Sequence, residues 1–454
     1  KKTWDPQLVS RGQIAFQSRC TDCHDANKSL GTSKSLAGWR STVRRMAGQD
    51  GADIPACDWE PIAVYLASLS SPSPGGAVDG TMLDVADSGS DVSVFGTISP
   101  TLRTLAGDLQ NGGFFPDAWL GVNWQPKGLP ISAKATACIS CHNESDEGFL
   151  SRLELVNAVL KLDIGQMVRD KKPCPACAQW EANVEAGRFV VPFGAFASQV
   201  NPGVYRTVSR PLMFNMGQRV FDEQLGDPVL PMPYSDEGAN FNISVPVFDD
   251  ITATMDAYVV NGLQGDDSGI SFDLSRDYVD NNRTPAVGGR WTIGNNMLRL
   301  GSSLMSGRFN GPEGTGPGGR AMQYSLIGAD ATFRYQDIFR LQAEFAQRNT
   351  DNFVNQPGML FGTDKVNGAY VEGELWVTRP LSLLLRWDLQ NQNYAARAAG
   401  SDIISPKFSV QRWTCGINYN IAANSLLMFN IEHWKLPDGM KDLNVVGVRW
   451  AASF

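Results

Sequence analysis

Strict alternation of apolar and polar side chains after about residue 90 limits the fold of this chain more than any other feature. Residues 381–390 place leucines and a tryptophan on one face, while Ser382, Arg386 and Asp388 lie on the other. Residues 339–345 repeat the pattern, with arginine, glutamine and glutamate on the polar face. A period of two is that of a β-strand, whose successive side chains point to opposite faces. Charges on one face of strand after strand suit a water-filled lumen with lipid outside, so the pattern predicts a transmembrane antiparallel β-barrel.

The connections between the predicted strands alternate between short and long. Tight turns are expected at residues 249–250, 294–296, 336–337, 379–380 and 421–424, and long polar connections at about 263–283, 308–319, 350–364 and 392–407. Outer-membrane barrels pair short periplasmic turns with longer external loops. Counting back from the C-terminus gives about 16 strands, an even number as expected when both ends lie in the periplasm.

The side of the membrane for residues 138–148 depends on one further segment. If residues 192–238 form a single external loop, a turn at residues 165–178 is periplasmic and residues 138–148 lie on the outer side. If residues 211–220 are themselves a strand, the parity reverses and residues 138–148 become periplasmic. We expect the outer placement.

A different pattern precedes the barrel. Residues 6–19 predict a helix with Gly12 and Phe16 on one face, and residues 58–69 predict a second helix with apolar side chains at helical spacing. Two such helices can cross and enclose a flat ligand. A Ser/Pro/Gly-rich stretch follows, so we expect a helical domain at 1–70, a linker at 71–89 and the barrel at 90–454.

Two segments read C-x-x-C-H, the attachment signature of c-type haem. In this chemistry two thiols bond to the vinyl groups of the macrocycle, and the adjacent histidine becomes the proximal iron ligand. The chain has 3 histidines, and two of them end this pattern. We therefore predict two covalently bound haem c groups, held by Cys20, Cys23 and His24 and by Cys138, Cys141 and His142. The alternative for each motif is a redox or zinc-binding cysteine pair that happens to precede a histidine.

The distal iron ligands are less constrained. Residues 39–46 resemble the distal-ligand segment of small class I cytochromes c, which implies Met46 as sixth ligand of the first haem. A thioether opposite histidine raises the reduction potential, whereas the alternative is that Met46 fills the small core. The flanks of the second motif read as strands, and Met213, Met216 and Met232 are its only candidate ligands, each more simply read as packing.

The remaining cysteines and the third histidine carry weaker signals. Cys174 and Cys177 lack a following histidine and are a disulfide candidate in an oxidising envelope. Cys57 is unassigned. Cys415 and His433 each share a face with apolar residues of a predicted strand, so we expect both on the outer wall of the barrel.

Family resemblances agree with this organisation. Residues 186–194 (AGRFVVPFG), residues 258–262 (YVVNG), the alternating hairpins and the C-terminal Phe454 resemble phosphate-type porins over roughly residues 90–454. A small haem domain followed by a porin resembles the fused cytochrome–porins of iron-oxidising bacteria. The second C-x-x-C-H inside the barrel segment is a departure from that pattern. The resemblance implies a bacterial outer-membrane protein whose N-terminal domain is periplasmic or lies in the barrel lumen.

Composition and charge narrow the function. A net charge of -8 and a pI near 5.1 would repel phosphate backbones, so we expect no nucleic acid partner. Residues 1–4 lead straight into a polar amphipathic segment, so we expect the numbering to start at a processed N-terminus. The expected partners are outer-membrane lipid and periplasmic or extracellular redox proteins or metal ions.

The leading hypothesis is a dihaem electron carrier that works across or at the outer membrane, with extracellular metal oxidation or reduction as one role it would serve. An electron carrier is favoured over a substrate-converting enzyme. Two alternatives stay open: a dihaem peroxidase-like or reductase-like enzyme with an open iron position, and a porin or anchor subunit of a larger cytochrome assembly.

Overall fold

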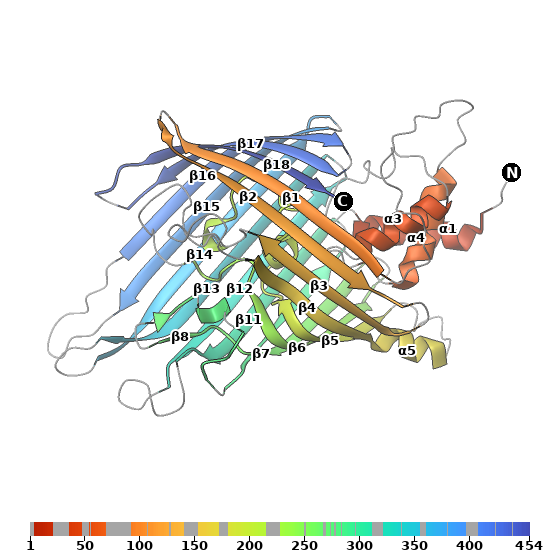
Figure 1. Ribbon diagram of the computed structural model, residues 1–454, viewed down its shortest axis with the longest axis horizontal. Helices are drawn as coiled ribbons and strands as arrows, with labels where there is room; N and C mark the ends of the chain where they lie inside the picture. Colours follow the sequence, from red (N-terminus) through yellow and green to blue (C-terminus); the bar gives the residue numbers. More distant parts are fainter. Residues whose placement is uncertain are drawn as a thin grey trace.

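The computed structural model describes a long barrel and a small group of helices (Figure 1). The described residues are 4–20, 36–47, 54, 56–69, 92–106, 108–126, 129–139, 153–171, 180–214, 228–248, 251–266, 269–310, 321–336, 338–354, 360–378, 380–395, 407–422, 424–437 and 439–454, without residues 273, 277, 283 and 296. Six of the predicted site residues are not among the described residues: Cys23, His24, Cys141, His142, Cys174 and Cys177.

The barrel is closed, and every neighbouring pair of its strands is antiparallel. In chain order its strands are β1 (Val92–Leu105), β2 (Asp108–Trp124), β3 (Ile131–Ile139), β4 (Leu153–Asp163), β5 (Glu181–Val190), β6 (Ser235–Pro246), β7 (Thr252–Val260), β10 (Ala286–Gly294), β11 (Leu298–Arg308), β12 (Gln323–Tyr335), β13 (Phe339–Val354), β14 (Leu360–Trp376), β15 (Leu381–Ala395), β16 (Lys407–Ala422), β17 (Ser425–Lys435) and β18 (Leu443–Ser453). Closure joins β1 to β18, where Gly96 and Phe454 exchange backbone hydrogen bonds of 3.1 and 3.0 Å. The predicted number of strands is confirmed over the described residues.

The two faces of the strands differ as the alternation predicted. Leu383 and Leu385 on β15 are 45% and 51% exposed, whereas Arg386 and Asp388 on the same strand are fully buried. A closed barrel pairs all of its backbone groups between strands, and an apolar outer band allows it to lie in lipid. This is the architecture of a membrane-spanning β-barrel. Separately, none of the described helices is long and apolar enough to cross a membrane.

The connections identify the two ends of the barrel. At the end that holds the C-terminus, five pairs of strands are separated by only two to five residues: β6 and β7, β10 and β11, β12 and β13, β14 and β15, and β16 and β17. These strand ends agree with the five predicted turns, although several of the turn residues lie outside the described ones. That end is periplasmic by the rule that short turns face the periplasm. At the opposite end β5, β7, β11 and β15 end and β6, β10, β12 and β16 begin, and the stretches of sequence between these strands are longer. The predicted long loop at 350–364 is shorter, because pairing of β13 with β14 continues to Val354 and Leu360.

The preferred parity is confirmed. The connection between β3 and β4 lies at the external end, and helix α5 (Ile164–Lys171) lies at the periplasmic end. No strand occupies residues 211–214, which contain the 3₁₀ turn η4 (Leu212–Phe214) after η3 (Phe196–Gln199). The connection 261–285 contains a separate two-stranded sheet, β8 (Gly265–Asp266) with β9 (Gly269–Ile270), and the 3₁₀ turn η5 (Leu274–Arg276).

The N-terminal helices form a separate apolar core. They are α1 (Pro6–Ala15), a π-helical turn η1 (Phe16–Cys20), α3 (Leu36–Ala47) and α4 (Ala56–Leu69). Helix α1 begins at the cap Asp5, whose carboxylate accepts a 2.9 Å hydrogen bond from Gln7 N, with Pro6 in the first turn. Both predicted helices are present, and the first is regular only to Ala15 before the π turn. Figure 1 shows this helical unit outside the barrel, at the end that also holds α5 and the C-terminus.

Candidate functional site

The first C-x-x-C-H motif begins where the N-terminal helix ends. Cys20 is the last residue of η1 and is half-buried. It packs against the buried core of the helical unit, which includes Phe16, Trp39 and Tyr65. The motif therefore starts at the edge of an aromatic-rich core rather than in an isolated loop.

Met46 lies beside the same core. It is near the end of α3 and packs against the cluster that Cys20 also contacts. Thus the structure brings Cys20 and Met46, 26 residues apart in the sequence, to one apolar cluster. Iron ligation by Met46 stays a prediction.

Helices α1 and α4 cross in close contact at Gly12. A Cβ on Gly12 would lie 1.9 Å from the carbonyl oxygen of Pro61 and 2.8 Å from Tyr65 Cβ, so only glycine allows this approach. The phenyl ring of Phe16 lies 5.8 Å from that of Tyr65 at the same crossing. The predicted crossing of the two helices is present.

An ion pair joins α3 to α4 on the outside of the unit. Arg40 donates to both carboxylate oxygens of Glu60, at 2.7 and 2.5 Å. This hydrogen bonding holds the pKa of Glu60 below its ordinary value and raises that of Arg40. Because both side chains are about half exposed, the pair orients the helices more than it stabilises them.

One ion pair ties the motif to the barrel. Arg19, next to Cys20, contacts the carboxylate of Glu181 at 3.2 Å, and both side chains are mostly buried. Glu181 is the first residue of β5, at the periplasmic rim. Cys20 therefore directly follows a residue that contacts that rim.

The second motif begins inside the barrel, at the external end of β3. Cys138 is fully buried in the lumen among Trp119, Val156 and Phe189. Its sulfur is in a disulfide bond. Met213 and Met232 belong to the same buried cluster, and Met216 lies outside the described residues. The disulfide at Cys138 must be reduced before this cysteine can form a thioether.

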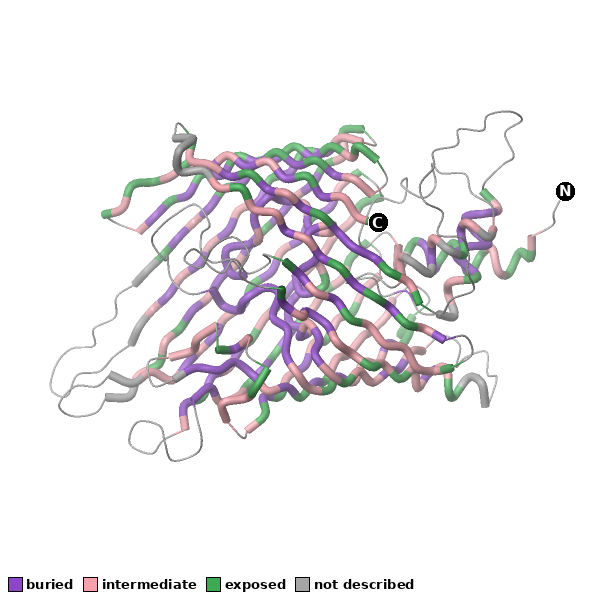
Figure 2. The backbone as a smooth tube through the Cα atoms, in the orientation of Figure 1, coloured by how far each residue is buried: buried purple, intermediate pink, exposed green. Residues whose placement is uncertain are grey.

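The lumen is filled by the chain itself. The connection between β5 and β6 enters the barrel, and Figure 2 shows buried backbone through its interior. Residues of this connection that are at most 5% exposed include Phe193, Phe196, Tyr205, Leu212, Met213, Phe214, Val229, Leu230, Met232 and Tyr234. The expectation of a water-filled lumen is wrong for this part of the barrel. The physical reason is that inward charges such as Arg386, Arg412 and Asp388 pair with one another and with the inserted segment in place of water.

Residues 205–212 run lengthwise along the inner wall. Near the periplasmic end, a Cβ on Gly203 would lie 2.6 Å from Ser453 Oγ. Midway, Val208 Cγ1 would lie 2.7 Å from a Cβ on Gly447. Toward the external end, Leu212 packs against Val410 and Trp434. We call residues 205–212 the strap.

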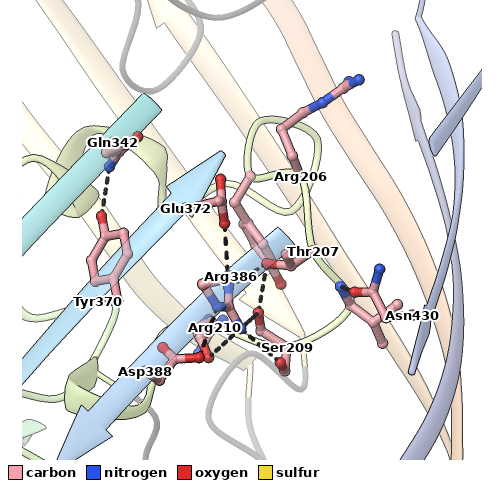
Figure 3. Close-up of polar contacts among 12 residues, drawn as sticks. Arg206, Thr207, Ser209, Arg210, Gln342, Tyr370, Glu372, Arg386, Asp388 and Asn430 are labelled. Carbon is pink, nitrogen blue, oxygen red and sulfur yellow. Dashed lines mark hydrogen bonds and ion pairs between the residues drawn. The ribbon is translucent and has the colours of Figure 1, made fainter. Parts of the chain in front are cut away.

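Wall arginines hold the strap by its backbone (Figure 3). Arg386 donates to Thr207 Oγ1 at 2.6 Å, to the carbonyl of Ser209 at 3.1 Å and to that of Arg210 at 3.3 Å. Arg412 donates to the same carbonyl of Arg210 at 2.6 Å. The sequence marked these arginines as inward-facing but gave no signal for their partners.

The charges of this wall are paired. Arg386 and Arg412 share the carboxylate of Asp388 at 2.9 and 3.0 Å, and Arg386 also lies 3.5 Å from Glu372. All of these side chains are buried. Buried charges are tolerable when each has a partner and further hydrogen bonds, and both conditions hold here.

The outer-wall predictions are confirmed. Cys415 and His433 are exposed on the lipid-facing side of β16 and β17, and Cys415 has a free thiol. His433 Nδ1 lies 2.9 Å from Asn444 Oδ1 on β18.

No protein-family model matches the sequence, and no curated protein is significantly similar to it. Solved structures share its fold at low identity. The anion-selective porin from Comamonas acidovorans is 14% identical with a TM-score of 0.49, covering 80% of this chain and 99% of that one. The DcaP channel of Acinetobacter baumannii is 11% identical (TM-score 0.48; 81% and 99% covered), and OmpF of Salmonella typhi, in complex with daunomycin, is 9% identical (0.49; 82% and 99%).

The closed barrel, its apolar exterior and its alternating turns define the class of this molecule on their own. It is a porin-like β-barrel of the bacterial outer membrane, in contact with lipid around its circumference.

Proposed function

We propose that the chain is a c-type cytochrome–porin that moves electrons at the outer membrane. In this proposal the helical unit is the redox carrier and the barrel holds it at the periplasmic face. The observation that carries the proposal is the packing of Cys20 and Met46 against one apolar core, in a unit whose Arg19 pairs with Glu181 at the barrel rim.

The donor set fits a covalently attached haem. Cys20 and Cys23 would bond to it, and His24 and Met46 would be its axial ligands. When bound, haem c supplies a one-electron centre whose potential is raised by thioether ligation and by an apolar surround. The chain supplies that surround through Trp39, Phe16 and Tyr65, which exclude water from the core.

Met46 favours a carrier over an enzyme. An enzyme of the peroxidase or reductase type needs an open iron position, whereas the thioether of Met46, packed on the same core as Cys20, could fill it. A filled lumen likewise argues against free diffusion of solutes as the main role. If the chain bound no haem, the remaining alternative would be a barrel that anchors a larger cytochrome assembly.

The second motif extends the proposal across the membrane. A haem on Cys138, Cys141 and His142 would lie at the external end, opposite the helical unit, and would give an acceptor or donor site for extracellular metal ions or redox proteins. It requires reduction of the disulfide at Cys138. The number of attached haems therefore distinguishes a transmembrane conduit from a periplasmic carrier.

The test is intact-mass spectrometry and haem staining of the full chain, made in a host with a c-type haem attachment system. We expect the wild-type mass to include two haems. Cys20→Ala with Cys23→Ala should remove one, Cys138→Ala with Cys141→Ala should remove the other, and the lipid-facing control Cys415→Ala should remove none. One haem, lost only with the first pair, would reduce the proposal to a periplasmic carrier, and a chain without haem would overturn it.

A further inference from the structure

We propose that the strap, residues 205–212, is a fixed seal that keeps the barrel from conducting ions, and that Arg386 is its principal anchor. The proposal does not depend on haem binding. It concerns a segment whose backbone is held mainly by side chains of the barrel wall.

The strap is held along its whole length. Its backbone receives hydrogen bonds from Arg449 to Tyr205 O at 2.6 Å and from Asn418 to Arg206 O at 2.9 Å. In the other direction, Val208 N donates to Asn430 Oδ1 at 2.5 Å, and Leu212 N donates to Asp388 Oδ1 at 3.1 Å. Side chains of β15, β16, β17 and β18 thus replace the water or strand partners that these backbone groups would otherwise need.

Arg386 joins more of the strap than any other described side chain. Its guanidinium contacts three successive parts of the segment, Thr207, Ser209 and Arg210, and it also donates to Ser209 Oγ at 3.0 Å. A guanidinium presents five donors in a rigid plane, so one side chain can fix several acceptors at once. The ion pair between Arg386 Nε and the Asp388 carboxylate, at 2.9 Å, holds the guanidinium plane in this orientation.

The strap closes the lumen together with the apolar residues beside it. Phe196 stacks on Phe214 with ring centroids 5.7 Å apart and lies 5.9 Å from Tyr205. On the wall, Arg449 lies over the Tyr205 ring at 3.8 Å. An ion entering this region would have to lose its hydration shell and disrupt the paired side chains of the wall, which is unfavourable.

The inward-facing side chains of the barrel wall beside the strap are also buried. Six successive inward positions of β15, residues 382, 384, 386, 388, 390 and 392, are at most 4% exposed. An open aqueous channel would expose such residues to water. Their burial over most of the strand indicates that the described strap leaves no water layer between itself and this wall.

The experiment is ion conductance of the full chain in planar bilayers. We expect wild-type insertions to show no steady channel current, and Arg386→Ala to raise the current by tenfold or more, since several charge-assisted hydrogen bonds are lost together. The matched control is Arg290→Ala. Arg290 is also an inward wall arginine, but it pairs with Asp330 and Ser303 rather than with the strap.

Two further variants guard against loss of folding. Arg386→Lys keeps the charge but loses the planar set of donors, so it should leak less than Arg386→Ala and more than wild type. A disulfide between Gly203→Cys and Ser453→Cys, which the geometry at Gly203 favours, should close Arg386→Ala again and reopen it on reduction. Wild-type current at the level of an open porin, or Arg386 variants no leakier than Arg290→Ala, would overturn the proposal. A chain that seals but binds no haem would reject the electron-transfer function and leave the seal intact.

Discussion

Replacing Gly12 by alanine should destabilise the helical unit, although the same change stabilises most helices. At an exposed helical position, alanine is favoured over glycine by about 1 kcal/mol. At Gly12 the new Cβ would lie 1.9 Å from Pro61 O, and that carbonyl would have to recede by about 1.5 Å to reach the 3.4 Å of ordinary contact. Overpacking of this kind costs about 1–3 kcal/mol, and the upper end applies because the obstructing atom belongs to the backbone. We expect a net loss of about 2 kcal/mol.

Pulse proteolysis in increasing urea measures this loss, because it reports the fraction of chains whose N-terminal unit is open to cleavage. The control is Gln13→Ala, an exposed position on the same helix, which should change stability by less than about 0.5 kcal/mol. If Gly12→Ala were as stable as wild type or more so, the close crossing of α1 and α4 would be wrong. Under the proposed function, the same variant should also lose covalent haem.

Three further predictions concern the same unit. Trp39→Ala should destabilise it by about 3–5 kcal/mol in the proteolysis assay, because Trp39 is a fully buried core residue, and a loss below about 1 kcal/mol would contradict that burial. Glu181→Lys should release the helical unit from the rim and increase the rate at which protease separates it from the barrel. The reversed pair, Arg19→Glu with Glu181→Arg, should restore the wild-type rate. Equal cleavage rates of the wild type, Glu181→Lys and the reversed pair would show that the ion pair does not hold the unit. Because the pKa of Glu60 is lowered by folding, its contribution to the stability of the unit is present above the ordinary glutamate pKa of 4.5 and is lost as pH falls through the lower folded value. Glu60→Gln should therefore reduce the loss of stability at acid pH by no more than about 0.5 kcal/mol. Urea unfolding at pH 3 to 6 measures this difference.

The barrel was largely predictable because its determinants are local. A strand's period of two is legible in each segment, and residues 381–390 and 339–345 face as the sequence indicates. The tight turns lie between neighbouring strands, so the positions of the loops fixed which end of the barrel holds Cys138. That placement also depended on residues 211–220 not forming a strand, which the sequence left open.

The strap was not predictable, because its partners are distant in the sequence. Thr207 and Arg386 are 179 residues apart, and Arg206 and Asn418 are 212 apart. No periodicity reports that an arginine will bind carbonyl oxygens of a segment without regular structure. For the same reason, inward charges were read as facing water when they face the chain itself.

The candidate redox site divides in the same way. The spacing of Cys20, Cys23 and His24 is local chemistry, and the crossing at Gly12 follows from two amphipathic helices. The Arg19–Glu181 pair joins residues 162 positions apart and appears only in the fold. The disulfide at Cys138 is likewise invisible in a motif that looks the same at both sites.

A sealed barrel and an electron-transfer role support each other physically. An open pore would let ions cross the membrane beside any redox centre, whereas a closely packed interior excludes ions and gives electrons a medium without water-filled gaps. Under the two proposals, the strap and the apolar cluster around Cys138 would form such an interior between the periplasmic rim, where Arg19 contacts Glu181, and the external end of β3. The decisive combination is therefore haem at both motifs in a barrel that conducts no ions. Two haems in a freely conducting barrel would leave electron transfer possible but would remove the reason for a strap anchored along its length.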